Sequence, residues 1–109
     1  MTPDTQPLTI AEAQALVDRW ITTVGNGYHG VLTNMAILAE ETGEVARCIA
    51  RLYGDQRAKP GDRLDLADEL ADLMWVLMAI ANQTGTDLTD ALRRNLHKKQ
   101  TRDATRFRD

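Results

Sequence analysis

The chain has few of the residues on which covalent cross-links and transition-metal sites depend. Its 109 residues include one cysteine, Cys48, and two histidines, His29 and His97. A single cysteine excludes an intrachain disulfide and a cysteine-rich metal site. The histidines do not fit the Glu-x-x-His pattern of di-iron carboxylate bundles, because Asn26 precedes His29 by three residues and Arg94 precedes His97 in the same way. A di-iron protein is therefore excluded.

Long apolar runs and alternating strand patterns are also missing. No apolar stretch approaches the ~18 residues of a membrane span, and Met1–Leu8 lacks signal-peptide character. We therefore expect no membrane association and a cytoplasmic location. No segment alternates apolar and polar residues for long enough to predict a strand. The sequence predicts an all-α protein.

The length of the chain suits one compact domain with a small core. We expect a single domain over residues 1–109, with 1–7 as a loose lead-in and 101–109 as a frayed basic tail. Because a small core gains stability when copies bury further surface against one another, we also expect a homo-oligomer.

Positive charge is in slight deficit, since the formal net charge is -3. This balance argues against nucleic-acid binding by the domain as a whole. The charges are unevenly placed: residues 40–72 carry nine of the sixteen acids, and residues 93–108 carry seven of the thirteen Lys and Arg. An acidic middle and a basic end suit a metal ion with a polyanionic substrate, but equally a charged helical surface with a solvated tail.

Apolar residues recur every three or four positions in four segments, which predicts four helices. These segments cover residues 9–24, 32–53, 62–82 and 87–100. Thr9 is expected to cap the first helix and Asp62 the third, and Thr86 or Asp87 the fourth. Because the connections are short, the helices predict an antiparallel four-helix bundle-like domain.

The densest chemical signal is a group of acids on the second and third helices. The second helix carries Glu40, Glu41 and Glu44, and the third carries Glu69 and Asp72. Residues three or four apart share one helix face, so the acids of each helix point in a common direction. Apolar residues adjoin them along these faces, which places the acids at the edge of the core. Carboxylates gathered there repel one another and lose solvation.

A divalent cation would remove both penalties. Hard oxygen donors favour magnesium or manganese over zinc or copper. Magnesium also leaves coordination positions for phosphate oxygens, which phosphoryl chemistry needs. The alternative from a different class is a non-catalytic helical interaction module, whose acids face water or bind a basic partner, because acidic helix faces are common.

The order and spacing of the acids resemble a known family, the MazG-like all-alpha nucleoside triphosphate pyrophosphohydrolases. The family pattern is EExxE on one helix and ExxD on the next, and 24 residues separate Glu44 from Glu69 here. The resemblance runs from Asn34 to Arg108 and includes LAEETGEVARCIARLYG, LADELADLMWVLMAIANQTGTDL and ALRRNLHKKQTRD. It implies that a nucleoside triphosphate is hydrolysed to a nucleoside monophosphate and pyrophosphate. Phosphoribosyl-ATP pyrophosphohydrolases, which share the carboxylate pattern, are the second enzymatic candidate.

The resemblance also implies roles for the motif acids. The metal ligands of relatives correspond here to Glu41, Glu44, Glu69 and Asp72. The expected ion is Mg²⁺, with Mn²⁺ as a substitute. Glu40 matches the first motif acid and is assigned to a further metal or to the attacking water, so that Glu40 and Glu41 form the expected catalytic pair. Family members assemble as dimers or tetramers, which implies a homodimer or homotetramer.

The basic end of the chain departs from the family pattern. Relatives often carry a lysine, then a Lys-Asn pair, then an arginine, where this chain has Asn95, Lys98-Lys99 and Arg102. Lys98 and Arg102 are still expected to bind the triphosphate, because arginine binds phosphate in a bidentate manner and lysine supplies a point charge. The alternative is that both only complement the macrodipole at a helix C-terminus.

Three further residues are candidates for binding the nucleoside. Trp20 and Trp75 could stack on a base, although an aromatic at helical core spacing is more often simply part of the core. Asn34, near the start of the second helix, could contact the base or the sugar, or could merely cap the helix.

Overall fold

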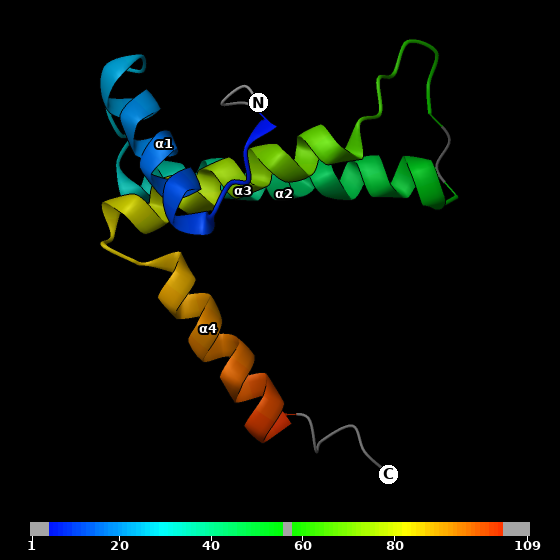
Figure 1. The fold of residues 1–109 in the computed structure, drawn as a ribbon. Coiled ribbons are helices and arrows are strands. Elements are labelled where there is room, and N and C mark those ends of the chain that lie inside the picture. The colour runs from blue at the N-terminus through cyan, green and yellow to red at the C-terminus, as the bar shows by residue number, and fades with distance from the viewer. Residues whose placement is uncertain (1–4, 56–57, 104–109) are drawn as a thin grey trace.

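Helices make up most of the described chain, and Figure 1 shows their arrangement. The computed structural model describes residues 5–55 and 58–103. Its elements are α1 (Ile10–Thr23), α2 (Val31–Tyr53), α3 (Leu66–Gln83), α4 (Leu88–Lys98) and the π-helix η2 (Lys99–Asp103). None of the described residues lies in a strand. The expectation of an all-α fold is confirmed.

The two chain ends are described only in part. Residues 1–4 of the expected lead-in and residues 104–109 of the expected basic tail lie outside the described residues. The last helix was expected to fray after about Gln100, but residues 99–103 form the π-helix η2. Within 5–55 and 58–103, no helix combines the length and apolar character that crossing a membrane requires.

Short polar side chains begin α1 and α4, as the sequence predicts. Thr9 Oγ1 accepts a hydrogen bond from the backbone N–H of Glu12 at 3.1 Å. Asp87 Oδ1 accepts one from the backbone N–H of Asp90 at 3.2 Å. Each bond satisfies one of the amide groups that the first turn of a helix leaves without a partner.

The third helix starts later than predicted, and the expected cap was wrong. Asp65 is the N-cap, and its Oδ1 accepts from the backbone N–H of Asp68 at 3.1 Å. Asp62 Oδ2 instead accepts from the backbone N–H of Lys59 at 2.9 Å and lies 3.4 Å from Arg51 Nη1 of α2. The Lys59 hydrogen bond and then the Arg51 charge lower the pKa of Asp62. An ion pair to another helix therefore keeps Asp62 in the loop.

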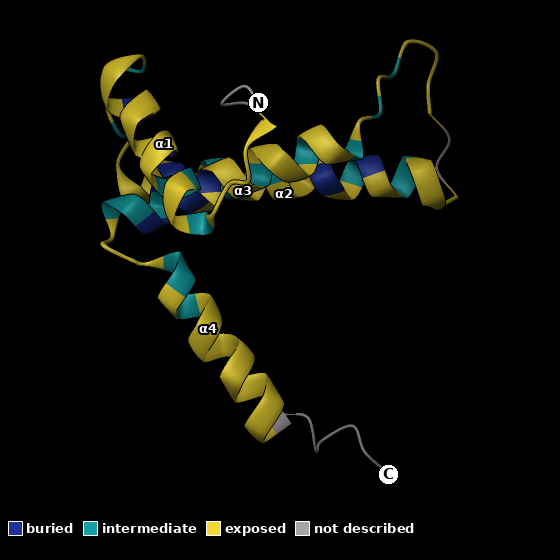
Figure 2. Cartoon of the chain, viewed as in Figure 1, coloured by how far each residue is buried: buried dark blue, intermediate teal, exposed yellow. Residues whose placement is uncertain are grey.

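α2 and α3 lie side by side, and α1 packs on α3 at one end of this pair (Figure 1). One group of buried side chains joins α1 to α3 and consists of Val17, Ile21, Met78 and Ala79. Further buried apolar residues are Val45, Cys48, Val76 and Ala81. Figure 2 shows buried residues where α1 meets α3 and also farther along α2, whereas most of α4 is exposed. The core is small and belongs to α1, α2 and α3.

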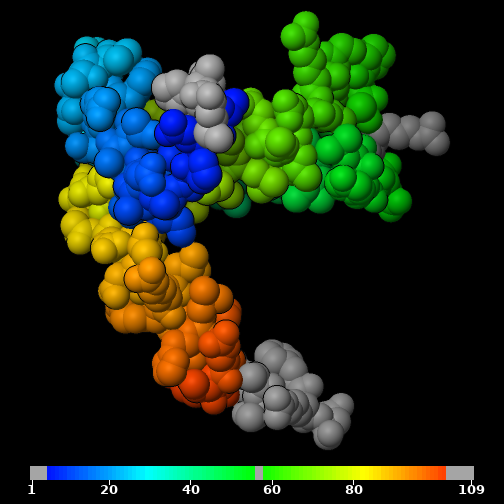
Figure 3. Space-filling view, in the orientation of Figure 1, coloured from blue at the N-terminus to red at the C-terminus, as the bar shows by residue number. Residues whose placement is uncertain are grey.

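α4 projects away from the other helices (Figures 1 and 3). It meets them at α1, and the side chains of Leu92 and Leu96 on its apolar face stay about half exposed. The radius of gyration is 17.2 Å, whereas a compact domain of this length has about 13 Å. The single chain therefore does not close the expected four-helix bundle, because the other described helices meet only the first part of α4 and leave much of its apolar face exposed.

One side chain of α1 fixes the point from which α4 departs. Gln14 Nε2 donates to Asn82 Oδ1 at 3.1 Å and to the Thr86 carbonyl at 3.0 Å. Gln14 Oε1 accepts from the backbone N–H of Leu88 at 3.0 Å, and Asn82 Nδ2 donates to the Gln14 carbonyl at 2.9 Å. One amide group thus joins α1, the end of α3 and the first residue of α4.

The substitution Gln14→Met tests this junction, because it removes the amide at constant side-chain length. We expect the free energy of unfolding to fall by about 1–3 kcal/mol, since polar partners at the junction lose their bonds. The amide of Leu88 should also exchange its hydrogen faster. Denaturant unfolding and hydrogen exchange measure both effects. Gln100→Met, the same change at an exposed position, is the control, and equal stabilities of the two variants would contradict the role of Gln14.

Candidate active site

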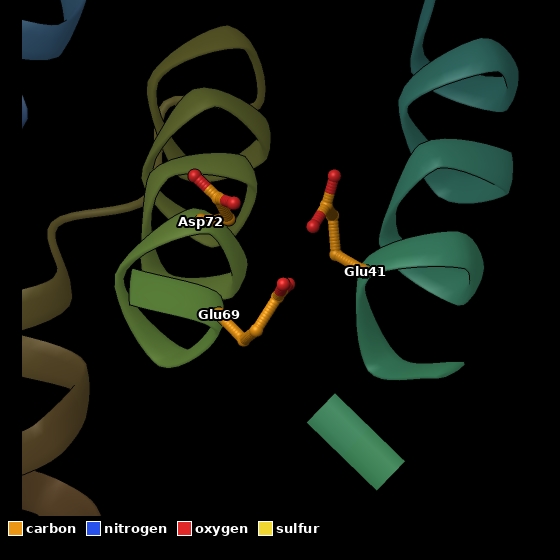
Figure 4. A group of neighbouring side chains, drawn as sticks. All are labelled: Glu41, Glu69 and Asp72. Atoms are coloured by element: carbon orange, nitrogen blue, oxygen red, sulfur yellow. The ribbon is translucent and has the colours of Figure 1, made fainter. Parts of the chain in front are cut away.

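α2 and α3 bring three acids together. One carboxylate oxygen each from Glu41 of α2 and from Glu69 and Asp72 of α3 lies within 4.8 Å of the other two. Figure 4 shows the three side chains pointing toward one another between the two helices. Glu41 and Glu69 are partly buried, and Asp72 is exposed. The helical periodicity that puts Glu69 and Asp72 on one face thus directs both at Glu41.

The electrostatics of this group favour a bound cation. Partial burial and then the charges of Asp72 and Glu69 raise the pKa of Glu41 above its usual range. Glu44 and Glu40 add to the same effect. The ionised form of Glu41 is therefore disfavoured in the protein alone. Three oxygen donors under this constraint fit a hard divalent cation, which would reverse the shift by supplying opposite charge.

Two motif acids lie outside the group of three. Glu44 Oε2 is 3.3 Å from Arg47 Nε, in an ion pair with the next turn of α2. The side chain of Glu40 is exposed. Of the four metal ligands expected from the family pattern, the structure thus brings three together. The fourth, Glu44, pairs with Arg47 of its own helix instead.

A pocket of about 330 Å³ is lined by residues of α1, α2 and α3 and of the loop after α1. Its lining includes Trp20, Ile21, Asn34, Ile37, Trp75 and Val76. Ile37 lies one helical turn before Glu41 on α2. Val76 lies one turn after Asp72 on α3. The pocket and the three acids therefore occupy consecutive turns of the same helix pair, and its volume is that of a small-molecule site.

Two tryptophans form an aromatic wall of this pocket. The rings of Trp20 and Trp75 are 5.4 Å apart between centroids and meet edge to face, with 82° between their planes. Trp20 is 49% exposed and Trp75 is 39% exposed. Neither is a buried core residue, so part of each ring surface is open to contact with a ligand.

Asn34 belongs to the same pocket and is only 6% exposed. It does not cap α2, whose N-cap residue is Gly30 and which has no side-chain cap. Its Nδ2 donates to Gln83 Oε1 at 2.7 Å, and Gln83 Nε2 donates to the His29 carbonyl at 2.9 Å. Gln83 was not predicted from the sequence. The available signal was the polar pair Asn82-Gln83 at the end of an otherwise apolar helix.

The expected phosphate-binding residues lie away from the acids within the chain. Lys98 and Arg102 are exposed, at the end of α4 and in η2. Figure 1 shows this end of the molecule projecting away from α2 and α3. Their neighbour Lys99 donates to Asn95 Oδ1 at 2.9 Å. The single chain thus does not join its basic end to its acidic group.

Known proteins match this chain over most of its length. The model of the MazG nucleotide pyrophosphohydrolase domain matches residues 29–107. YpjD of Bacillus subtilis (strain 168) is 38% identical over 100 residues, which are 91% of this chain and 90% of that protein. The Gene 37 protein of Mycobacterium phage L5 is 36% identical over 67 residues, which are 60% of this chain and 59% of that protein.

Two crystal structures share the fold. YPJD from Bacillus subtilis has a TM-score of 0.78 and 37% identity, over 90% of this chain and 99% of that chain. The Bacillus-conserved MazG protein, a nucleotide pyrophosphohydrolase, has a TM-score of 0.76 and 33% identity, over 90% of this chain and 96% of that chain. The sequence match, the shared fold and the acid pattern agree. The chain belongs to the MazG nucleotide pyrophosphohydrolase family and is a hydrolase.

Proposed function

We propose that this protein is a magnesium-dependent nucleoside triphosphate pyrophosphohydrolase that releases a nucleoside monophosphate and pyrophosphate. The observation that carries the proposal is the convergence of Glu41, Glu69 and Asp72 beside a pocket with exposed aromatic rings. The acids provide a place for a cation and the phosphates, and the pocket provides one for the nucleoside. A cytoplasmic location belongs to the same proposal, because cellular nucleoside triphosphates are found there.

Glu41, Glu69 and Asp72 would hold the cation. Glu44 would join them after turning away from Arg47, and its side chain, 49% exposed, has room to do so. Bound magnesium would neutralise negative charge on the phosphate oxygens and align them for in-line attack. Manganese, which accepts the same hard oxygen donors, would substitute.

Hydrolysis also needs an acceptor for the proton of the attacking water. With Glu41 engaged as a ligand, the adjacent Glu40 is the motif carboxylate left for this role. The water oxygen forms a bond to the α-phosphorus, and the bond from the α-phosphorus to the bridging oxygen breaks, so pyrophosphate leaves with the electron pair. Glu40 takes the proton of the water.

A screen for pyrophosphate release tests the proposed activity. The substrates are canonical and modified nucleoside triphosphates and phosphoribosyl-ATP, each with and without Mg²⁺. Magnesium-dependent release from a nucleoside triphosphate is the expected result. Release from phosphoribosyl-ATP alone would assign the chain to that related reaction. If no substrate released pyrophosphate, the acids would be better explained as a docking surface for a basic partner.

The metal assignment predicts that Glu41→Gln and Asp72→Asn each lower turnover by about two orders of magnitude or more, because each removes a charged ligand. The helical content in circular dichroism should stay the same. Steady-state pyrophosphate release at saturating Mg²⁺ measures the effect. Asp68→Asn, which changes an exposed acid of α3 outside the group, is the matched control. Near-normal activity of either site variant would remove that residue from the ligand set.

The metal-free stability of Glu41→Gln adds an independent check. Because the folded state raises the pKa of Glu41, it binds that proton more tightly than the unfolded chain does. Ionisation of Glu41 therefore costs stability as the pH rises. The variant should melt higher than the wild type at neutral pH, and the difference should vanish below the ordinary glutamate pKa of about 4.3. Equal melting temperatures at neutral pH would contradict the repulsion.

We also propose a homodimer or homotetramer in which a second copy covers the apolar groove between α3 and α4. The groove measures about 340 Å³ and its lining includes Met74, Leu77, Leu88 and Leu92. The extended α4, whose apolar side is uncovered in the single chain, would complete an antiparallel four-helix bundle between copies. Exposed apolar surfaces of this kind commonly form the interface between identical subunits.

Light scattering at micromolar concentration should therefore give the mass of a dimer or tetramer. Leu92→Glu, which places a charge in the groove, should shift the mass toward the monomer, because burying that charge is unfavourable. Leu8→Glu, at a position 62% exposed outside the groove, is the control. A wild-type protein that stays monomeric at these concentrations would refute the assembly.

The basic end would serve the active site of a second copy, since α4 carries Lys98 and Arg102 away from the acids of their own chain. Lys98→Ala and Arg102→Ala should each lower kcat/KM about tenfold or more, which corresponds to ~1.5–3 kcal/mol for a charge-assisted contact. Magnesium binding to the protein without nucleotide should not change. Arg94→Ala, which removes an exposed cation paired with Asp90 at 3.0 Å, is the control.

Two outcomes would separate this role from its alternatives. If Lys98 and Arg102 only complement the helix macrodipole, their loss should cost ~0.3–1 kcal/mol of stability and leave kcat/KM unchanged. If they act within their own chain, mixing Glu41→Gln chains with Lys98→Ala chains should restore no activity. Partial recovery in the mixture is expected when the two residues act across the interface.

A further inference from the structure

The wall of the pocket at Asn34 has a fixed hydrogen-bond polarity. The carbonyl of His29 can only accept, so the Gln83 atom 2.9 Å from it is the donor Nε2. Gln83 must then turn Oε1 toward Asn34, and this oxygen accepts a hydrogen bond from Asn34 Nδ2 at 2.7 Å. This relay leaves Oδ1, an acceptor, as the atom of the Asn34 side chain that remains for a further partner.

This oxygen is open to a ligand. It makes no hydrogen bond to another described residue, although the residue is only 6% exposed. Among the side chains of residues 5–55 and 58–103, no nitrogen or oxygen atom is both fully buried and unbonded. Oδ1 therefore has accessible surface, and Asn34 lines the pocket. The pocket thus presents an oriented acceptor beside its aromatic wall.

Helix geometry relates this acceptor to the acids. Asn34 and Glu41 are seven residues apart on α2, which is about two turns and ~10 Å along the axis, and they share a face. Ile37, between them, lines the same pocket. A nucleotide whose phosphates lie at Glu41 would therefore bring its base toward Asn34, beside Trp20 and Trp75.

We propose that Asn34, held by Gln83, selects nucleotides whose base carries an amino group at C4 of a pyrimidine or C6 of a purine, as in cytosine and adenine. Bases with a keto oxygen at the same position, uracil and hypoxanthine, are disfavoured. The inference rests on the proposed nucleotide site. An amino group donates to Oδ1, whereas a keto oxygen would meet it acceptor to acceptor. Rotating the Asn34 amide to suit a keto base would break its bond to Gln83 and leave further polar groups unpaired.

Calorimetric titration with α,β-methylene triphosphates and Mg²⁺ tests this selection without hydrolysis. The comparisons are cytidine against uridine and adenosine against inosine, at the same sugar. We expect the amino-bearing analogue to bind about tenfold or more tightly in at least one pair, because a buried acceptor without a donor is penalised. Equal affinities in both pairs, or a preference for the keto bases, would overturn the proposal.

Substitutions at Gln83 separate selection from mere helix pairing. Gln83→Met removes the relay at constant length, so Asn34 can rotate and the affinity ratio should fall to within about threefold. Gln83→Glu still accepts from Asn34 but cannot donate to His29, so its ratio should stay above that of Gln83→Met. Gln14→Met, the same change in the other amide junction, should lower the melting temperature and keep the ratio. A wild-type ratio in Gln83→Met would overturn the relay.

The measurements distinguish this inference from the proposed activity. A protein that hydrolyses nucleoside triphosphates but binds both members of each pair equally retains the activity and loses the inference. A protein that selects amino-bearing analogues but releases no pyrophosphate from them retains the pocket and loses the activity. Failure of every analogue to bind would overturn the inference directly.

Discussion

Where α2 meets α3, carboxylates that repel one another are held within a few ångströms. The packing of the two helices sets Glu41 against Glu69 and Asp72, and it raises the pKa of Glu41. Buried side chains along the same helices, such as Val45 and Val76, hold them together against this repulsion. In the proposed function, a cation and a polyphosphate relieve the repulsion, so what the protein loses in stability without them appears as affinity when they bind.

The second constraint is a shortage of buried apolar surface. α1, α2 and α3 share a small core, whereas α4 buries none of its residues in the single chain. The Gln14 junction holds the start of α4 in place, but farther along the helix Leu92 and Leu96 stay about half exposed. The separation of the basic end from the acidic group follows from this shortage. Assembly and phosphate binding are therefore coupled in the proposed function.

The features that depend on neighbouring residues were predicted from the sequence. Helical periodicity and capping chemistry are properties of neighbouring residues, so four helices and the convergence of acids from two of them were predictable. Features that depend on contacts between residues far apart in the sequence were not predicted. Asp62 and Asp65 are equally able to cap α3, and the ion pair with Arg51 of α2 selects Asp65. Gln83 gains its importance from Asn34, 49 residues away. The projection of α4 away from the other helices was also not predicted, because an apolar pattern does not indicate whether its apolar face is covered by the same chain or by another copy.

The edge-to-face pair at the pocket has a practical consequence. Trp20 and Trp75 are the only tryptophans of the sequence, and both line the pocket. Indole emission and near-ultraviolet tryptophan ellipticity of the chain therefore originate at this one place. Two indoles 5.4 Å apart and nearly perpendicular also couple their electronic transitions, and this coupling changes when either ring turns. The unlabelled protein thus carries its own optical probe of pocket occupancy.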